Sequence, residues 1–104
     1  ADHASLGPIE ACKERGAKVV GIIANQNELA PDNVVGSIEY SYAIALQNVM
    51  QDILDGKFEA RFYNSGFKEG ALIFHPNDKV ITSEQKAKVE DIIKQIVDGT
   101  LKVD

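Results

Sequence analysis

The residue types that could do chemistry in this chain lie in two short segments. Asn25 and Gln26 follow directly after an apolar run, and Lys68 stands between two glycines. Side-chain amides both donate and accept hydrogen bonds, as a hydroxyl-rich ligand requires, and a lysine supplies a cation. These groups favour the binding of a small polar molecule. Roles within the fold remain open: the amides could satisfy loop backbone, and Lys68 could pair with a carboxylate such as Glu69.

Patterns typical of catalysis are weak. His3 lies near the amino terminus and His75 precedes a proline, with no cysteine or second histidine at metal-ligand spacing. No serine lies in a nucleophile-elbow pattern, and no glycine-rich segment matches a phosphate-binding loop. The single cysteine, Cys12, excludes an internal disulfide and is expected to be a small buried residue on a short helix. We therefore predict no metal site, no cofactor and no enzymatic activity.

Length and charge narrow the class of protein. The 104 residues are enough for one domain, which should bury about two thirds of the surface of its unfolded chain. The net charge of -5 and the scattered lysines argue against nucleic-acid binding. No apolar run approaches the roughly 20 residues that span a membrane. The amino terminus lacks both a Met and the pattern of a signal peptide, so we expect that processing or truncation made this end.

The amino-terminal third predicts a helix, a strand and a loop. A helix of roughly eight to ten residues follows Gly7 and ends at Gly16. The continuous apolar run of residues 18–24 predicts a strand covered on both faces, as in a parallel sheet. The polar segment 25–33 predicts a loop at the carboxyl end of that strand, where open α/β sheets bind their ligands. Residues 34–35 predict a short strand.

Two longer helices are predicted by apolar residues at three- and four-residue spacing. The first begins at about Ser41 and is closed by Gly56. The second begins at a capping box with Thr82 or Ser83 as its cap and Gln85 as its third residue. It ends at Gly99, and we expect it to bury a stripe formed by Val89, Ile92, Ile93, Ile96 and Val97.

Between these helices the composition predicts two further strands. Residues 59–67 alternate imperfectly and contain aromatic residues, and Gly70 separates them from the apolar run 71–74. The two segments form either a hairpin or separate strands. The whole pattern predicts an α/β fold with a three-layer sheet. Because a parallel sheet usually needs more crossover units than this chain contains, we expect the chain to be part of something larger.

The order of several segments resembles the basic membrane protein family over nearly the whole chain. These segments are VVGIIANQ at residues 19–26, APDNV at 30–34, ILDGKF at 53–58, GFKEG at 66–70, KAKVE at 86–90 and DGTLKV at 98–103. Members of this family are substrate-binding lipoproteins of ABC importers, similar to the purine nucleoside receptors. The resemblance implies a type I periplasmic-binding-protein-like fold, an α/β/α arrangement with a mostly parallel sheet and two lobes that close over a ligand.

The same resemblance implies roles for particular residues. Asn25 would sit where the family usually has an aspartate that grips sugar hydroxyls, and Lys68 would be the motif lysine at the ligand cleft. Together with Gln26, these are the predicted ligand-binding residues. The amide at Asn25 departs from the family pattern, because a neutral group loses the stronger charge-assisted hydrogen bond. The aromatic residues that stack on a base would come mainly from the other lobe.

The resemblance predicts a non-enzymatic solute receptor that binds a nucleoside-like molecule and delivers it to an ABC permease. The protein would act outside the cytoplasm, as a cell-membrane lipoprotein or in the periplasm. Residues 1–104 would form a single α/β unit at the carboxyl-terminal end of the receptor, and residues 34–40 would cross between the lobes. The following helix would pack on the amino-terminal lobe, so the isolated chain should form a homo-oligomer or belong to a longer protein.

Two alternatives accompany this hypothesis. The first is a ligand-sensing domain of a transcriptional or signalling regulator with the same fold. The second is a fragment of an α/β enzyme, which the absence of a visible nucleophile or acid-base pair disfavours.

Overall fold

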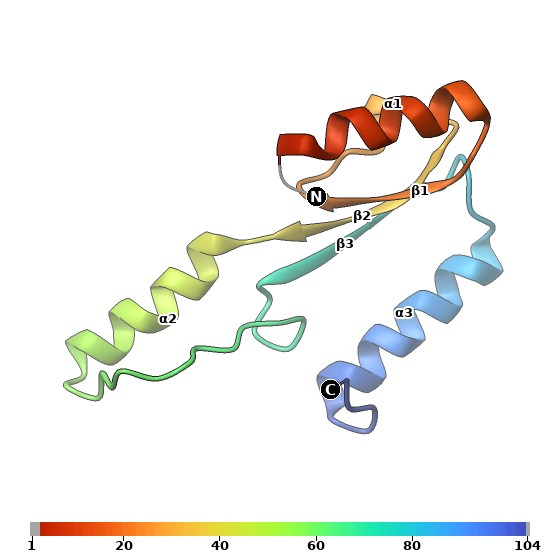
Figure 1. Cartoon of the computed structure of the whole chain (residues 1–104). Helices are drawn as coiled ribbons and strands as arrows, with labels where there is room; N and C mark the ends of the chain where they lie inside the picture. The colour runs from red at the N-terminus through yellow and green to blue at the C-terminus, as the bar shows by residue number, and fades with distance from the viewer. Residues whose placement is uncertain (1–2, 104) are drawn as a thin grey trace.

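The structure is a computed structural model that describes residues 3–103, and it combines three strands with helices (Figure 1). This arrangement confirms the predicted α/β class. In chain order the elements are η1 (His3–Ser5), α1 (Leu6–Arg15), β1 (Val19–Ile23), η2 (Asn27–Leu29), β2 (Val34–Tyr40), α2 (Tyr42–Leu54), β3 (Leu72–Pro76) and α3 (Ser83–Asp98).

The three strands form one sheet in the order β1-β2-β3. β1 and β2 are parallel, with Ile22 opposite Ile38, whereas β3 is antiparallel to β2, with Leu72 opposite Tyr40. The prediction of parallel pairing therefore holds for β1 and β2. β3 runs the other way because the chain leaves the sheet along β2, passes through α2 and returns from the same end.

The helices lie on both sides of the sheet. Figure 1 shows α1 on one side of the strands and α3 on the other, while α2 extends beyond the end of β2. α1 ends as predicted, because Gly16 adopts the left-handed conformation and its N–H bonds to the carbonyls of Cys12 and Lys13. Cys12, which was expected to be buried, is only partly covered, since α1 meets the rest of the chain along one face. The buried face of α1 carries Ile9, which packs with Ala30 and Val34.

The buried core is small for a chain of this length. Only four hydrophobic residues of the described chain are buried, namely Ile9, Ala30, Val34 and Ala71. The radius of gyration is 16.4 Å, whereas a compact domain of this length has about 13 Å. The accessible surface of 7494 Å² exceeds the roughly 5,700 Å² typical of this mass. The chain thus leaves uncovered an area comparable to that of a protein–protein interface.

Seven of the fifteen exposed large hydrophobic residues in the described chain lie on the two long helices, five of them on α2. On α2, the side chains of Leu46 and Met50 are each 61% exposed, and Leu54 is 78% exposed. The apolar face of α2 is therefore uncovered in this chain. On α3 the predicted buried stripe is wrong: Val89 and Ile92 are exposed, and no residue of α3 is buried. A three-stranded sheet offers these helices too little apolar surface to cover their stripes.

The amino-terminal end of α3 confirms the predicted capping box. Thr82 Oγ1 accepts a hydrogen bond from the backbone N–H of Gln85, and Gln85 Oε1 accepts one from the N–H of Thr82. Two of the N–H groups that a helix start leaves unpaired are thereby satisfied. Gly99 ends the helix in the left-handed conformation, also as predicted.

The segment between α2 and β3 corrects the predicted strands. Residues 59–67 form no strand and β3 pairs with β2, so the hairpin alternative is wrong. Side-chain contacts hold the segment against α2 instead: Arg61 reaches Asp52 at 3.2 Å, and the guanidinium of Arg61 lies 4.0 Å from the ring centroid of Tyr63. β2 is longer than predicted because β3 pairs with it from Gly36 to Tyr40.

Candidate functional site

The three predicted ligand-binding residues lie on two loops that connect to one end of the sheet. We call it the carboxyl edge: the carboxyl ends of β1 and β2 together with the turn at residues 66–70, which leads into β3. Asn25 and Gln26 follow β1, and Lys68 lies in the turn. Because β1 and β2 are parallel and β3 is antiparallel to β2, both loops connect to the same end of the sheet. The loop after β1 then folds back over β2, where Asn27 bonds to the carbonyls of His75 and Pro76 at the other end of β3. No hydrogen bond or ion pair within residues 3–103 joins Lys68 to either amide.

A strained residue turns the chain at the end of β1. Ile23 has a φ of 76°, the single positive value at a non-glycine residue among those described. A β-branched side chain rarely adopts this conformation, which costs on the order of 1–3 kcal/mol and is found most often at functional sites. The turn folds the following loop back over β2, where the backbone N–H of Gln26 donates to Ser37 Oγ at 3.0 Å.

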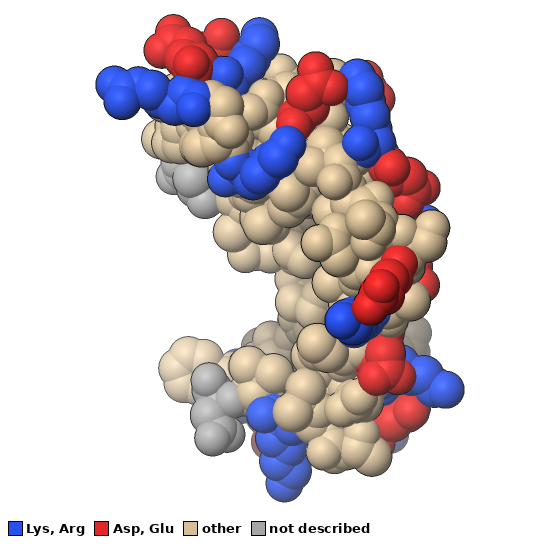
Figure 2. Space-filling view, turned by 90° about the vertical axis from the view of Figure 1, so that its right-hand side faces the viewer, with Lys and Arg blue, Asp and Glu red and all other residues tan. Residues whose placement is uncertain are grey.

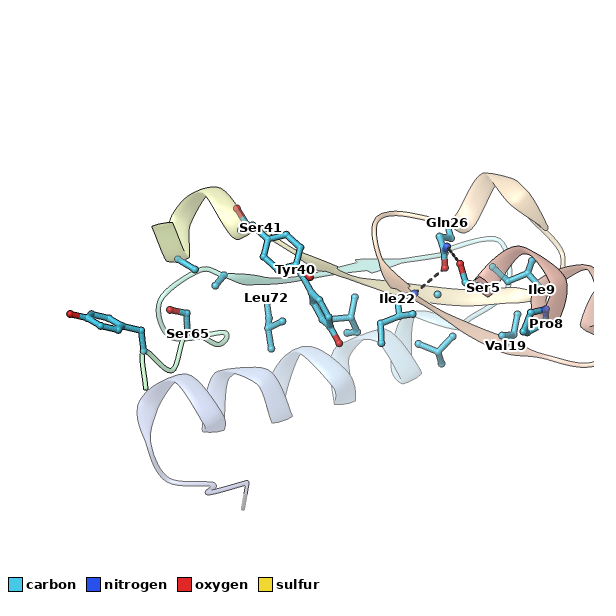
Figure 3. A pocket seen from close by; sticks show the side chains of 17 residues that line it. Ser5, Pro8, Ile9, Val19, Ile22, Gln26, Tyr40, Ser41, Ser65 and Leu72 are labelled. Atoms are coloured by element: carbon cyan, nitrogen blue, oxygen red, sulfur yellow. Dashed lines mark hydrogen bonds between the residues drawn. The ribbon is translucent and has the colours of Figure 1, made fainter. Parts of the chain in front are cut away.

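Gln26 uses both ends of its amide within the fold. Its Oε1 accepts a hydrogen bond from the N–H of Ile22 at 3.0 Å, and its Nε2 donates to Ser5 Oγ at 2.6 Å, as the dashed lines in Figure 3 show. The side chain is partly buried. This geometry fits the alternative in which the amide satisfies loop backbone, and it makes Gln26 a residue that positions the loop.

Ser37 is the centre of a hydrogen-bond network that sequence reasoning missed. Its side chain is fully buried, and its Oγ donates to Asn27 Oδ1 at 2.8 Å while accepting from Gln26. Asn27 Nδ2 in turn donates to the carbonyls of His75 and Pro76, each at 3.2 Å. The loop after β1 is thus fastened to β2 through Ser37 and to β3 through the carbonyls of His75 and Pro76. A serine inside an otherwise buried strand was the available signal, since buried hydroxyls need partners.

Gly21 makes room for this network. A Cβ atom at Gly21 would lie 2.4 Å from Ser37 Oγ and 3.0 Å from Gln26 Cβ. Any side chain here would therefore displace the serine or the glutamine. The glycine in the middle of β1 is explained by this close approach, because the strand conformation itself accepts any residue.

Asn25 is the exposed member of the predicted set. Its Oδ1 accepts a hydrogen bond from the backbone N–H of Asn27 at 3.1 Å, and its side chain is exposed. Its Nδ2 makes no hydrogen bond to any other described residue. Asn25 therefore presents an amide N–H₂ group to solvent at the carboxyl edge, from a loop that the Ser37 network holds in place.

Lys68 occupies an exposed turn whose shape depends on Glu69. The Glu69 carboxylate accepts a hydrogen bond from the backbone N–H of Gly66 at 2.8 Å. This bond and a further one from its own backbone N–H hold the pKa of Glu69 below its usual range, with a smaller contribution from the charge of Lys68. Within the described residues, Lys68 forms no ion pair with Glu69. The side chain of Lys68 is exposed.

A histidine and a carboxylate also meet on this sheet. His75 Nε2 lies 2.6 Å from Glu39 Oε2, and neither residue was predicted as part of a site. Ser37 is opposite His75 in the β2–β3 register, which brings serine, histidine and glutamate onto neighbouring strands. The Ser37 hydroxyl, however, is buried and already bonded to Asn27 and Gln26. Because this hydroxyl group is buried and already both donates and accepts a hydrogen bond, it is not available as a nucleophile.

An apolar hollow of about 690 Å³ lies beside the carboxyl edge. Side chains from the sheet line it, and Figure 3 shows Ile22 and Leu72 projecting to the same side. Gln26 lies at its rim, whereas Asn25 and Lys68 are not part of its lining. Val20, which also lines the hollow, is 58% exposed. The hollow is therefore uncovered surface of the sheet, and Gln26 is the one predicted ligand-binding residue that lines it.

Charge is mixed on the face that Figure 2 presents, where acidic and basic side chains alternate around a tan surface. The chain also forms ion pairs such as Lys79–Asp32 at 2.9 Å, and the hydrogen bond and charge of Lys79 lower the pKa of Asp32. Within residues 3–103, no helix is long and apolar enough to cross a membrane. In the same range, no three His, Cys, Asp or Glu side chains gather closely enough to hold a metal ion.

The fold is an α/β unit with polar amides on the loop after the parallel strand β1, and the carboxyl ends of parallel strands are the usual ligand-binding end of such sheets. The family described as ABC transporter substrate-binding protein PnrA-like matches residues 1–104. The chain belongs to this family.

Curated relatives agree with this assignment. The chain is 32% identical over 96 residues to basic membrane protein A of Borreliella burgdorferi, and 30% identical over 96 residues to basic membrane protein A1 of Borrelia garinii subsp. bavariensis. In each case the match covers 88% of this chain and 28% of the relative. The chain thus spans less than a third of the length of these relatives.

A solved structure shares the fold. The crystal structure of a transcriptional activator of the comK gene from Bacillus halodurans superposes with a TM-score of 0.79 over all of this chain and 37% of that chain. The two are 19% identical in sequence, so the likeness concerns the fold alone.

Proposed function

We propose that this chain is the carboxyl-terminal portion of a solute-binding receptor of an ABC importer. The receptor binds a nucleoside-like small molecule in a cleft between two lobes and delivers it to a permease in the membrane. It works outside the cytoplasm, as a lipoprotein or in the periplasm. The family match over residues 1–104 is the observation that carries the proposal.

The geometry of the carboxyl edge supports a binding role. Asn25 is exposed on a loop that is fixed to β2 and β3 through Ser37 and Asn27. Lys68 is exposed in a turn that Glu69 braces. Groups held in place before a ligand arrives lose less conformational freedom on binding, which favours affinity. Polar groups that are held in place in this way suit a receptor that binds a solute and releases it unchanged.

The unpartnered surfaces support the two-lobed arrangement. Leu46, Met50 and Leu54 lie along α2 with most of their side-chain surface exposed. Contiguous apolar surface of this kind marks an interaction site. We assign it to the amino-terminal lobe of the same receptor, on which α2 packs after β2 crosses over. A regulator with the same fold is the alternative, and the sequence comparisons favour the transporter receptor.

Binding by the full-length polypeptide that carries these residues tests the proposal. Isothermal titration calorimetry with adenosine, inosine, guanosine and uridine should detect binding of at least one nucleoside. Lys68→Ala should weaken that binding about tenfold, since it removes a charged donor. Lys88→Ala is the matched control, because Lys88 is an exposed lysine on α3 that pairs with Glu84. Failure to bind any nucleoside would refute the nucleoside proposal, and an unchanged affinity in Lys68→Ala would remove Lys68 from the site.

A further inference from the structure

Glu39 lies where the two parallel strands end. In the β1–β2 register Glu39 is opposite Ile23, the last residue of β1. Because side chains alternate along a strand, Glu39 lies on the same face of the sheet as Ser37, two residues earlier. The loop after β1 folds over this face, where Ser37 Oγ bonds to Gln26 and Asn27. Glu39 is therefore the last side chain of β2 on the face that carries the loop.

One oxygen of the Glu39 carboxylate is held by His75. The Nε2 atom of His75 lies 2.6 Å from Glu39 Oε2. Since an ionised carboxylate only accepts hydrogen bonds, Nε2 carries a proton and donates it. The main chain of His75 is anchored as well, because its carbonyl accepts a hydrogen bond from Asn27 Nδ2 at 3.2 Å. The contact thus restricts the rotation of the carboxylate and sets the direction of its second oxygen.

That second oxygen, Glu39 Oε1, is an acceptor without a partner among the described residues. Within residues 3–103, His75 is the single residue that forms an ion pair with Glu39. The side chain of Glu39 is 38% exposed, so the carboxylate is open to solvent in part. A charged acceptor forms a stronger hydrogen bond to a hydroxyl group than a neutral oxygen does. An oriented carboxylate at the usual ligand-binding end of the sheet is thus suited to a hydroxyl group.

We propose that Glu39 is a ligand-binding residue of this receptor, whose Oε1 accepts a hydrogen bond from a hydroxyl group of the ligand, and that His75 is the positioning residue that orients it. This inference rests on the proposed function and deepens it, because it names a group that recognises a hydroxyl. It requires neither Asn25 nor Lys68. Glu39 and His75 lie on β2 and β3, and sites on strands are held more precisely than sites on loops.

The alternative is that the pair only joins β3 to β2. Ion pairs that are as exposed as this one add little to stability, and backbone hydrogen bonds already join the two strands from Gly36 to Tyr40. The two interpretations differ in one measurable property. A carboxylate that binds the ligand is coupled to one hydroxyl group of that ligand, whereas a carboxylate that serves the sheet alone is not.

The experiment measures calorimetric affinities of the full-length polypeptide for adenosine, guanosine, inosine and uridine, and for their 2′-, 3′- and 5′-deoxy analogues. The natural chain should bind one parent nucleoside at least about tenfold more tightly than one of its deoxy analogues, since the analogue loses a hydrogen bond to a charged group. In Glu39→Gln the amide oxygen still accepts from His75, but a neutral N–H₂ group replaces Oε1. The preference for the hydroxyl should then fall to within about threefold.

The matched control is Glu84→Gln, because Glu84 is an exposed glutamate that pairs with Lys88 on α3. This variant should keep the preference of the natural chain. Glu39→Gln conserves the size of a partly exposed side chain, so both variants should unfold at nearly the same urea concentration.

Two further variants test the positioning role of His75. In His75→Ala the carboxylate keeps its charge but loses its fixed direction, so the preference for the hydroxyl should fall at least about threefold. In His75→Gln an amide N–H₂ group can donate to Glu39 in place of Nε2, and the preference should be retained. A histidine that serves the sheet alone would change the urea midpoint and leave the preference unchanged.

The outcomes separate the inference from the proposed function. If the natural chain binds nucleosides but prefers no parent over its deoxy analogues, no hydroxyl is recognised and the inference is overturned while the receptor function stands. The same holds if Glu39→Gln keeps the preference, because the hydroxyl is then bound by another group. If no nucleoside binds, the proposed function fails and this inference fails with it.

Discussion

The sharpest test of the loop geometry is the replacement of Ser37 by alanine. The hydroxyl is fully buried, accepts from the N–H of Gln26 and donates to Asn27 Oδ1. Ser37→Ala leaves both partners without a bond, and each buried unsatisfied group costs about 1–3 kcal/mol. Since the loop is partly exposed and admits some water, we expect the lower half of that range for each group. The free energy of unfolding should fall by about 2–4 kcal/mol.

The neighbouring glycine turns this prediction into a double-mutant cycle. Gly21→Ala alone places a Cβ 2.4 Å from Ser37 Oγ, an overpacking that typically costs about 1–3 kcal/mol. In Gly21→Ala/Ser37→Ala that oxygen is gone, and the nearest remaining contact is Gln26 Cβ at 3.0 Å. The free energy of unfolding of the double variant should therefore fall by at least about 1 kcal/mol less than the sum of the losses in the two single variants.

Urea unfolding of the full-length polypeptide, followed by circular dichroism, measures these free energies. Ser83→Ala is the control, because Ser83 is exposed and surface replacements usually change stability by less than about 0.5 kcal/mol. If the losses in free energy of unfolding of the two single variants simply add in the double variant, a Cβ atom at residue 21 does not clash with Ser37. A loss below about 0.5 kcal/mol in Ser37→Ala would refute the role of the network in holding the loop.

Three further outcomes are expected. Ile23→Gly should be less destabilising than Ile22→Gly by about 1–2 kcal/mol in the same urea assay, because glycine relieves the positive φ at residue 23; equal losses would mean that the turn carries no strain. Leu46→Ala should cost about 2–5 kcal/mol in the full-length polypeptide if α2 packs on another lobe, although the residue is exposed in this chain; a loss below about 0.5 kcal/mol would contradict the two-lobed arrangement. The lowered pKa of Glu69 means that its carboxylate stabilises the turn above its ordinary titration range, and that this stabilisation is lost as pH falls through the folded pKa. Amide exchange of Gly66 should accelerate there, and Glu69→Gln should abolish that pH dependence.

Local chemistry in the sequence was enough to predict most element types and several boundaries. The capping box at Thr82 and the glycines at positions 16 and 99 mark helix ends through bonds among neighbouring residues, and all three are confirmed. The apolar run before Asn25 predicted a strand with a polar loop at its carboxyl end, which the structure contains as β1 and the residues that follow it. The family membership likewise follows from the order of segments.

Pairing and burial depended on the tertiary structure. Residues 59–67 have strand-like composition, but their side chains find other partners: Arg61 pairs with Asp52 of α2, and Tyr63 stacks on Phe58. β3 instead takes the edge of β2. The stripe of α3 was predicted from periodicity alone, which says which face is apolar but cannot say whether another surface exists to cover it.

The candidate site shows the same division. Sequence alone determined which polar residues lie on the loops beside the strands, including Asn25, Gln26 and Lys68. Tertiary structure decided which of their atoms are hydrogen-bonded within the fold. The side-chain amide of Gln26 bonds to Ile22 and Ser5, whereas Asn25 uses only its Oδ1. The reason is physical: a hydrogen bond satisfies a group only through direction and distance, and both are set by parts of the chain as remote in sequence as Ser5 is from Gln26.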